Sequence, residues 1–233
     1  MRHITFASEN MSISAEKCRE SALKYGCDES IIYTPDNFDT EFRKLNEPIL
    51  SQSRGAGYWL WKPYVIKRAL DTMKDGELLI YTDAGILFEN HVDLMVQEMN
   101  NDVMVFGNRW RHGDWCKMDV LREMECVQFS DREQLQASCL IIRKSDYSTR
   151  FISVWLETCQ KDGYIDDSES KLPNPTGWRE HRHDQAILTN LVFINNIPVH
   201  WWPAQYNVRH RHNYSSKYPV MFLHHRKRNE EYK

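Results

Sequence analysis

The chain has 233 residues, a formal net charge of −3 and a pI of about 6.4, so any site for a polyanion must be local rather than a property of the whole surface. Hydrophobic residues make up 41% and charged residues 27%, which is typical of a globular protein. No apolar run approaches the roughly 20 residues that a membrane-spanning helix needs, and we expect no signal peptide. Six cysteines without a CxxC pair favour free thiols in a reducing compartment, so we expect a cytoplasmic protein.

The first half of the sequence predicts strands that alternate with helices. The expected strands are short and apolar and cover residues 4–8, 30–34, 78–82 and 103–106. The expected helices cover residues 12–25 or 14–25, 39–50, 64–73 and 92–99. Such alternation is typical of a largely parallel sheet with helices on both faces.

The second half is more irregular and predicts a mixed extension of the same sheet. Strands are expected at 139–143, 199–203 and 220–223, and helices at 145–159 and 183–191. Residues 114–125 form a polar, irregular segment, and the glycines and prolines of 162–180 indicate a loop. No repeat or linker divides the chain, so we expect a single domain.

An acidic turn follows one of the apolar strands. Asp83 comes directly after the strand Leu78–Thr82 and is followed by small Ala84 and Gly85. Ligands of open α/β sheets bind at the carboxyl ends of the strands, where a carboxylate can reach a metal ion. Asp and Gly are also common turn formers, so the triplet alone leaves both interpretations open.

An aromatic, glycine-rich segment, R-G-A-G-Y-W-L-W-K-P, precedes that strand. Tyr58, Trp59, Trp61 and Tyr64 lie within seven positions and are interleaved with glycines and Lys62. Each aromatic side chain alone would suit the core. Together they favour a loop that closes over phosphates or stacks on a sugar or base.

Later in the chain, His181-Arg182-His183-Asp184-Gln185 opens a predicted helix. Asp184 can serve simply as an N-cap, or it can present a carboxylate to a sugar beside the amide of Gln185. Trp201 and Trp202 stand on a predicted strand, where neighbours alternate between the faces. Only one of the two can therefore point inward.

The last apolar strand ends in His224-His225-Arg226-Lys227-Arg228. This pattern suits an anion site, a metal site or a solvated tail. Imidazole and carboxylate together suit a divalent transition metal such as Mn²⁺. The cations beside it would suit a diphosphate.

Taken together, four motifs resemble those of small GT-A-fold glycosyltransferases of bacterial polysaccharide clusters and large viruses, over about residues 4–228. The motifs are R-G-x-G-Y-W-x-W-K-P, Y-T-D-A-G, H-R-H-D-Q-x-I-L and F-L-H-H-R-K-R. The resemblance implies a GT-A-like α/β fold with a mixed, mainly parallel sheet flanked by helices. It also implies a nucleotide-binding half (1–106) and an acceptor-side half (107–233) with a C-terminal segment for metal and diphosphate.

The activity that the resemblance implies is transfer of a hexose from a nucleotide-diphosphate sugar, UDP-hexose above all, to a hydroxyl of a glycan or other acceptor. Mn²⁺ or Mg²⁺ would be held by Asp83 and His224, since Gly85 replaces the second carboxylate of the family's metal motif. Asp184, with His183 and Gln185, would act at the reacting centre. Residues 110–115 and 136–138 would border the donor sugar and the acceptor.

The resemblance further implies a set of residues around the donor nucleotide and its diphosphate. They are Ala7, Ser8, Glu9, Tyr33, Thr34, Arg54, Trp61, Lys62, Tyr81, Thr82, Ala84, Arg226 and Lys227.

Four alternatives remain at this point. A sugar nucleotidyltransferase would carry glycines and cations after the first strand, where this chain has Ala7-Ser8-Glu9-Asn10. A non-catalytic carbohydrate-binding protein would use the tryptophans as platforms. A degenerate transferase would follow from the missing carboxylate at position 85. Nucleic-acid binding through 209–212 and 226–228 is disfavoured by the net charge and the lack of a known motif.

Overall fold

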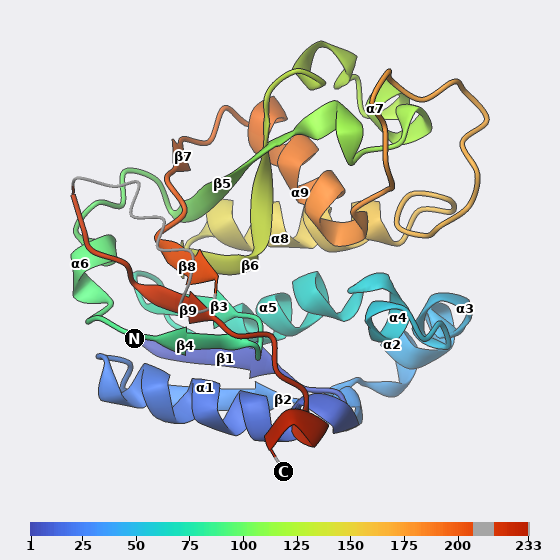
Figure 1. Ribbon diagram of the computed structural model, residues 1–233. Helices are drawn as coiled ribbons and strands as arrows, with labels where there is room; N and C mark the ends of the chain where they lie inside the picture. The colour runs from blue at the N-terminus through green and yellow to red at the C-terminus, as the bar shows by residue number, and fades with distance from the viewer. Residues whose placement is uncertain (207–216, 233) are drawn as a thin grey trace.

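The computed structural model describes residues 1–206 and 217–232 (Figure 1). It describes the side chains of these residues except those of Glu9, Gln205 and Tyr206. The basic cluster 209–212 that the nucleic-acid alternative invoked lies outside the described residues.

The main sheet has six strands in the order β2-β1-β3-β6-β5-β7. Pairing is parallel for β1 with β2, β1 with β3 and β5 with β7, whereas β6 is antiparallel to both of its neighbours. Five strands therefore run in one direction, and the predicted mixed, mainly parallel sheet is confirmed. The strands are β1 (Arg2–Phe6), β2 (Glu29–Tyr33), β3 (Leu78–Thr82), β5 (Val103–Arg111), β6 (Glu133–Arg143) and β7 (Val199–His200).

Helices cover both faces of this sheet. The α-helices are α1 (Ser12–Lys24), α2 (Thr40–Leu45), α3 (Glu47–Leu50), α4 (Gly55–Tyr58), α5 (Trp61–Asp71), α6 (Asp93–Val96), α7 (Met118–Glu123), α8 (Asp146–Cys159) and α9 (His183–Ile194). Short 3₁₀ turns lie at η1 (Glu9–Met11), η2 (Pro35–Asn37), η3 (His112–Asp114), η4 (Val127–Phe129) and η5 (Asn229–Tyr232). No helix in the described part of the chain is both long enough and apolar enough to cross a membrane.

The alternation of side chains along β3 divides the core into two layers. Leu79 and Tyr81 pack with α5, α8 and α9 on one face, and Ile80 packs with α1 and a small second sheet on the other. Trp202 is buried in the second layer, whereas Trp201 is 54% exposed. Only one of the two tryptophans points inward, as predicted, but the expected strand 199–203 is wrong: β7 ends at His200, so neither tryptophan lies on a strand.

The second sheet has three strands in the order β4-β9-β8: β4 (Ile86–Phe88), β9 (Phe222–His224) and β8 (Ala204–Tyr206). β4 and β9 are antiparallel, with Ile86 opposite His224. The pattern did not predict β4, because three residues after a tight turn show too little alternation. Its pairing brings the end of the chain beside the acidic turn at Asp83.

Some elements differ from their predicted bounds. The expected helix 39–50 is two helices, because Asn46 leaves the helical conformation (φ −112°, ψ 14°) and Pro48 starts a new first turn. β6 spans 11 residues rather than 139–143, since its first half also pairs with β5. The expected helix 92–99 is only one turn, α6.

Candidate functional site

A cleft of about 1080 Å³ opens where β1 and β3 end. Its walls come from the segment after β1, the aromatic segment before α5, the turn after β3, the middle of β6, the start of α9 and the segment after β9. Of the predicted site residues it is lined by Ser8, Arg54, Trp61, Lys62, Asp83, Ala84, His183, Asp184, Gln185, His224 and Arg226. The sheet edge at which the sequence placed the site is thus hollow.

Lys62, at the start of α5, joins two carboxylates inside this cleft. Its Nζ lies 3.0 Å from Oδ2 of Asp184 and 3.4 Å from Oδ1 of Asp83. The side chains of Lys62 and Asp184 are each only 4% exposed, whereas that of Asp83 is 36% exposed. Three motifs that are far apart in the sequence therefore meet at one ammonium group.

Burial and the neighbouring charges shift the pKa values of Asp184 and Lys62 in opposite directions. Burial raises the pKa of Asp184 to about 6, Asp83 adds to that shift, and Lys62 opposes it. Burial disfavours the charged form of Lys62, but the attraction of Asp184 and Asp83 outweighs it and raises its pKa. Lys62 therefore stays cationic at neutral pH and compensates the carboxylates.

The turn after β3 fixes Asp83 at the cleft wall. The Tyr81 hydroxyl donates to Oδ1 of Asp83 at 2.5 Å, and the backbone N–H of Asp83 donates to the carbonyl of Ser138 on β6 at 2.9 Å. Tyr81 is fully buried. One carboxylate oxygen is thus held by Tyr81 and Lys62, and Asp83 presents the rest of its carboxylate to the cleft.

The β4–β9 pairing positions His224 near this turn. His224 is 6% exposed and lines the cleft. Burial lowers its pKa to about 3, against the opposing effect of Asp83, so its imidazole is neutral at pH 7. A neutral imidazole is the form that binds a metal ion.

Gly85 allows the segment after β9 to approach this closely. Its carbonyl accepts from the backbone N–H groups of His225 at 3.0 Å and Arg226 at 3.3 Å. A Cβ at Gly85 would lie 3.0 Å from the Cα of Arg226.

We expect Gly85→Ala to lower the free energy of unfolding by about 1–3 kcal/mol, because backbone rather than a flexible side chain must move. Urea unfolding measures this change, and an unaltered midpoint would contradict the close contact.

The start of α9 holds Asp184 between buried neighbours. His183 has a left-handed backbone (φ 47°), its Nδ1–H donates to the Ile165 carbonyl at 2.7 Å, and its ring stacks on Tyr58 with ring centroids 5.0 Å apart. Gln185 accepts from the Ala137 N–H at 3.3 Å and donates to Gln134 at 2.8 Å. His183 and Gln185 therefore position the start of the helix as well as lining the cleft.

The aromatic segment forms a left-handed turn. Gly55, Ala56, Gly57, Tyr58 and Trp59 all have positive φ, between 51° and 94°. Such a turn costs roughly 1–2 kcal/mol for each residue that is not glycine. Trp61 ties the turn to α5, because its Nε1–H donates to the Gly55 carbonyl at 2.9 Å and its ring stacks on Phe6 at 3.9 Å.

Arg54 lies at the rim of the cleft in ion pairs with the loop that precedes α9. Its guanidinium contacts both oxygens of Asp167, at 3.1 and 3.2 Å, and Glu180 at 2.7 Å. These carboxylates raise the pKa of Arg54, although burial acts against them. The cation that the sequence assigned to a diphosphate thus also joins two loops.

Other predicted donor residues lie around the cleft rather than in its wall. Among the described side chains, those of Ala7, Tyr33, Thr34, Tyr81, Thr82 and Lys227 do not line it. Thr82 instead contacts Nε2 of His3 at 2.9 Å, and Thr34 caps η2. Sequence reasoning missed Asn10, Pro35 and Arg182 as wall residues, and Arg228 is one more cation of the wall. The Lys62 bridge was also missed, and its only signal was a lysine between Trp61 and Pro63 at a helix start.

A possible metal site would be made of few protein ligands. In residues 1–206 and 217–232 no three His, Cys, Asp or Glu side chains gather as metal ligands. Asp83 and His224 together supply one carboxylate and one neutral imidazole to the cleft. This donor set fits Mn²⁺ or Mg²⁺ if substrate phosphates and water complete the coordination, which is how such ions are commonly bound.

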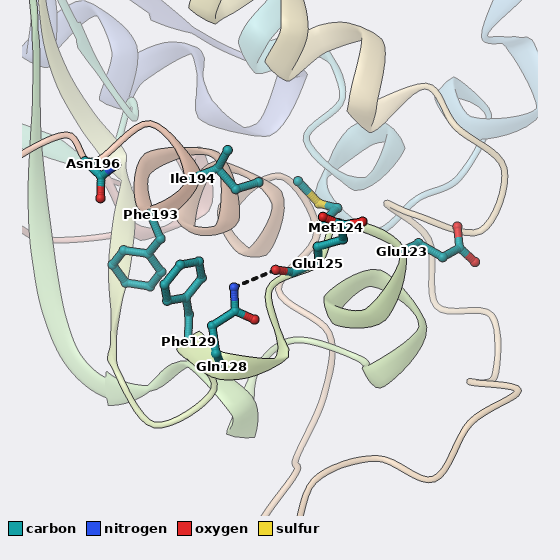
Figure 2. A pocket seen from close by; sticks show the side chains of 8 residues that line it. All are labelled: Glu123, Met124, Glu125, Gln128, Phe129, Phe193, Ile194 and Asn196. Carbon is teal, nitrogen blue, oxygen red and sulfur yellow. Dashed lines mark hydrogen bonds between the residues drawn. The ribbon is translucent and has the colours of Figure 1, made fainter.

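A second hollow of about 500 Å³ lies between the end of α9 and the segment after α7 (Figure 2). Phe129 and Phe193 meet there with ring centroids 5.3 Å apart, and Gln128 donates to the Glu125 carbonyl at 2.7 Å. No predicted site residue lines this hollow. This hollow shares no lining residue with the cleft and is not part of the candidate site.

No protein-family model matches the sequence, and no curated protein sequence matches it. Solved structures do match. The apo structure of the bifunctional glycosyltransferase WbbM aligns with a TM-score of 0.56 and 11% identity, over 97% of this chain and 45% of WbbM, so the chain spans less than half of that protein.

Two further structures align over most of both chains. Apo mouse xyloside xylosyltransferase 1 gives a TM-score of 0.54 at 11% identity and covers 97% of each chain. The galactosyltransferase LgtC, in complex with donor and acceptor sugar analogs, gives 0.54 at 13% identity over 97% of this chain and 87% of LgtC. At these identities the likeness establishes the fold. The predicted GT-A-type glycosyltransferase fold is confirmed.

Proposed function

We propose that this protein is a glycosyltransferase that moves a hexose from a nucleotide-diphosphate sugar, UDP-hexose above all, to a hydroxyl of a glycan acceptor. The fold supports this class of reaction, and a fold alone does not define an activity. The observation that carries the proposal is the bridge of Lys62 between Asp83 and Asp184 in a large cleft at the ends of β1 and β3. Ligands of such sheets bind at this edge.

Different walls of the cleft would bind different parts of the donor substrate. Phe6, Ser8 and Pro35, at or just after the ends of β1 and β2, lie where a nucleoside would be held. Arg226 and Arg228, after β9, are the cations that would pair with the diphosphate through charge-assisted hydrogen bonds. Asp184 lies deeper, with its carboxylate turned to the same space, and is our candidate for the carboxylate at the reacting centre.

Asp83 and His224 would hold a divalent ion, Mn²⁺ or Mg²⁺, beside the diphosphate. When bound, such an ion supplies Lewis-acid stabilisation of the negative charge on the leaving diphosphate. Lys62 adds a fixed positive charge in the same low-dielectric wall.

Reaction with a nucleotide sugar is the direct test of this function. Purified protein is incubated with UDP-glucose or UDP-galactose, Mn²⁺ and a mixture of oligosaccharides, and the release of UDP is measured. We expect UDP release that depends on both protein and acceptor. Binding of UDP without any release would instead support the degenerate transferase, and binding of oligosaccharides alone would support the carbohydrate-binding protein.

Replacing Asp83 with asparagine is expected to remove the Mn²⁺-dependent part of the stabilisation that UDP gives. Asparagine keeps a carbonyl oxygen that accepts from the Tyr81 hydroxyl, so the turn is preserved while the charge is lost. The melting temperature with UDP is measured with and without Mn²⁺. Asp71→Asn, which changes an exposed carboxylate on α5, is the control. An unchanged Mn²⁺ effect in Asp83→Asn would exclude Asp83 as a ligand.

A further inference from the structure

An exposed tryptophan stands on an irregular part of β5. The pairing of β5 with β6 shifts register between Gly107 and Arg111, and Arg109 has a left-handed backbone (φ 69°). The N–H of Trp110 donates to Oδ1 of Asn108 at 2.9 Å, which holds this bulge. Trp110 is 51% exposed. Bulges next to binding sites often re-aim a side chain, and here the bulge turns a large apolar ring to the surface.

Trp110 continues a series of stacked side chains that begins at the cleft. The guanidinium of Arg182, which lines the cleft, lies 4.4 Å from the ring centroid of Trp115. The guanidinium of Arg179 lies 5.5 Å from Trp115 and 5.8 Å from Trp110. The two indoles meet edge to face at 5.7 Å. We call Arg182, Trp115, Arg179 and Trp110 the tryptophan–arginine row.

The two arginines of the row differ in their charge partners. Arg182 pairs with Glu180 at 3.0 Å. Arg179 is exposed, and in the described part of the chain no carboxylate lies within ion-pair distance of its guanidinium. Its guanidinium lies against two indole rings, and it makes no side-chain hydrogen bond within the described residues. The outer end of the row therefore offers a flat apolar face beside an uncompensated guanidinium.

We propose that the tryptophan–arginine row binds the acceptor, and that the acceptor is a glycan that carries a carboxylate sugar. This inference rests on the proposed transferase function of the cleft. Indole offers a broad apolar surface that matches the C–H face of a pyranose ring, and guanidinium pairs with a carboxylate in a bidentate manner. Trp115 is buried and Trp110 is exposed, and neither lines the cleft, so a sugar on Trp110 leaves the cleft itself to the donor.

Retention of the labelled protein on an array of uronic-acid-containing and sialylated oligosaccharides tests the proposal, with their neutral counterparts on the same array. We expect retention on the carboxylated glycans. Binding should be at least about tenfold weaker for Trp110→Ala, which loses the stacking surface, and for Arg179→Ala, which loses a charge-assisted contact. Tyr147→Ala and Arg150→Ala, which change exposed residues on α8, are the matched controls and should bind as wild type does.

The proposal is overturned if the wild type is retained equally by the neutral glycans or by no carboxylated glycan, or if both row variants bind as it does. Thermal stabilisation by UDP with Mn²⁺ separates this failure from a failure of the transferase function. One outcome is that UDP stabilises the wild type and the row variants alike while the glycan array gives one of these contrary results. In that case only the acceptor inference is wrong. If UDP stabilises none of them, the proposed function itself is contradicted.

Discussion

Replacing Lys62 with methionine is expected to lower the free energy of unfolding by about 3–5 kcal/mol, because it removes one partner of a buried ion pair and leaves the other without compensation. Asp184 is 3% exposed, and its Oδ2 forms an ion pair with the Lys62 ammonium at 3.0 Å. Methionine fills a similar volume, so packing changes little and the lost charge dominates the effect. Urea unfolding measures it as a lower midpoint at an unchanged slope.

Lys67 on the same helix provides the matched control. It pairs with Asp71 at 2.6 Å, but both side chains are at least 35% exposed. Exposed pairs of this spacing contribute about 0.3–0.5 kcal/mol, so Lys67→Met should have a small effect. Equal effects at the two positions would contradict the buried bridge. The double variant Lys62→Met/Asp184→Asn should recover part of the stability, because no buried charge is then left unpaired.

The second large effect is expected on catalysis, from Asp184→Asn. If Asp184 takes part in proton transfer or charge stabilisation at the reacting centre, the turnover number should fall by about 10²–10⁴-fold. The affinity for UDP should change little, because asparagine keeps the shape of the side chain and the nucleotide-binding walls are elsewhere in the cleft. Turnover with UDP-hexose and acceptor, together with UDP binding, separates the two effects.

Asp166→Asn is the control for that variant. Asp166 also pairs with a buried lysine, since Lys117 is 2% exposed and their charged atoms lie 3.2 Å apart, but it lines no part of the cleft. We expect its turnover to stay near that of the wild type at temperatures where both are folded. Full activity of Asp184→Asn, or an equal loss in both variants, would remove Asp184 from the reacting centre.

Local sequence patterns were sufficient for the main sheet and for the edge that carries the site. The apolar run Leu78–Thr82 predicted β3 with its observed bounds, and Asp83 lies at its end as expected. The short apolar run and the turn residues on either side identify this strand, because β3 is buried between a turn with Gly76 and a turn with Ala84 and Gly85. The GT-A-type fold followed from motifs that are spread over the whole chain.

Contacts between distant segments could not be predicted. The Lys62 bridge exists because the start of α9 arrives beside the start of α5, and His224 reaches the cleft because β9 pairs with β4. Neither arrangement leaves a local pattern in the sequence. The two motif segments around Lys62 and Asp184 are separated by more than half of the chain.

The left-handed turn before α5 shows the same limit. Gly55 and Gly57 signal positive φ, but Tyr58 and Trp59 do not. Their rings both contact His183: that of Tyr58 stacks on it at 5.0 Å, and that of Trp59 is tilted against it at 5.3 Å between centroids. Sequence alone therefore predicted an aromatic loop and missed the backbone strain within it.

A thermal-shift measurement with UDP, GDP, CDP and dTDP, each with and without Mn²⁺, tests most directly whether the cleft is a nucleoside-diphosphate site. A ligand that binds only the folded state stabilises it by RT ln(1 + [L]/Kd), about 2.7 kcal/mol at a hundredfold excess over Kd. We predict a rise in melting temperature with UDP that requires Mn²⁺. No rise with any of the four diphosphates, with or without the metal, would contradict the proposed function.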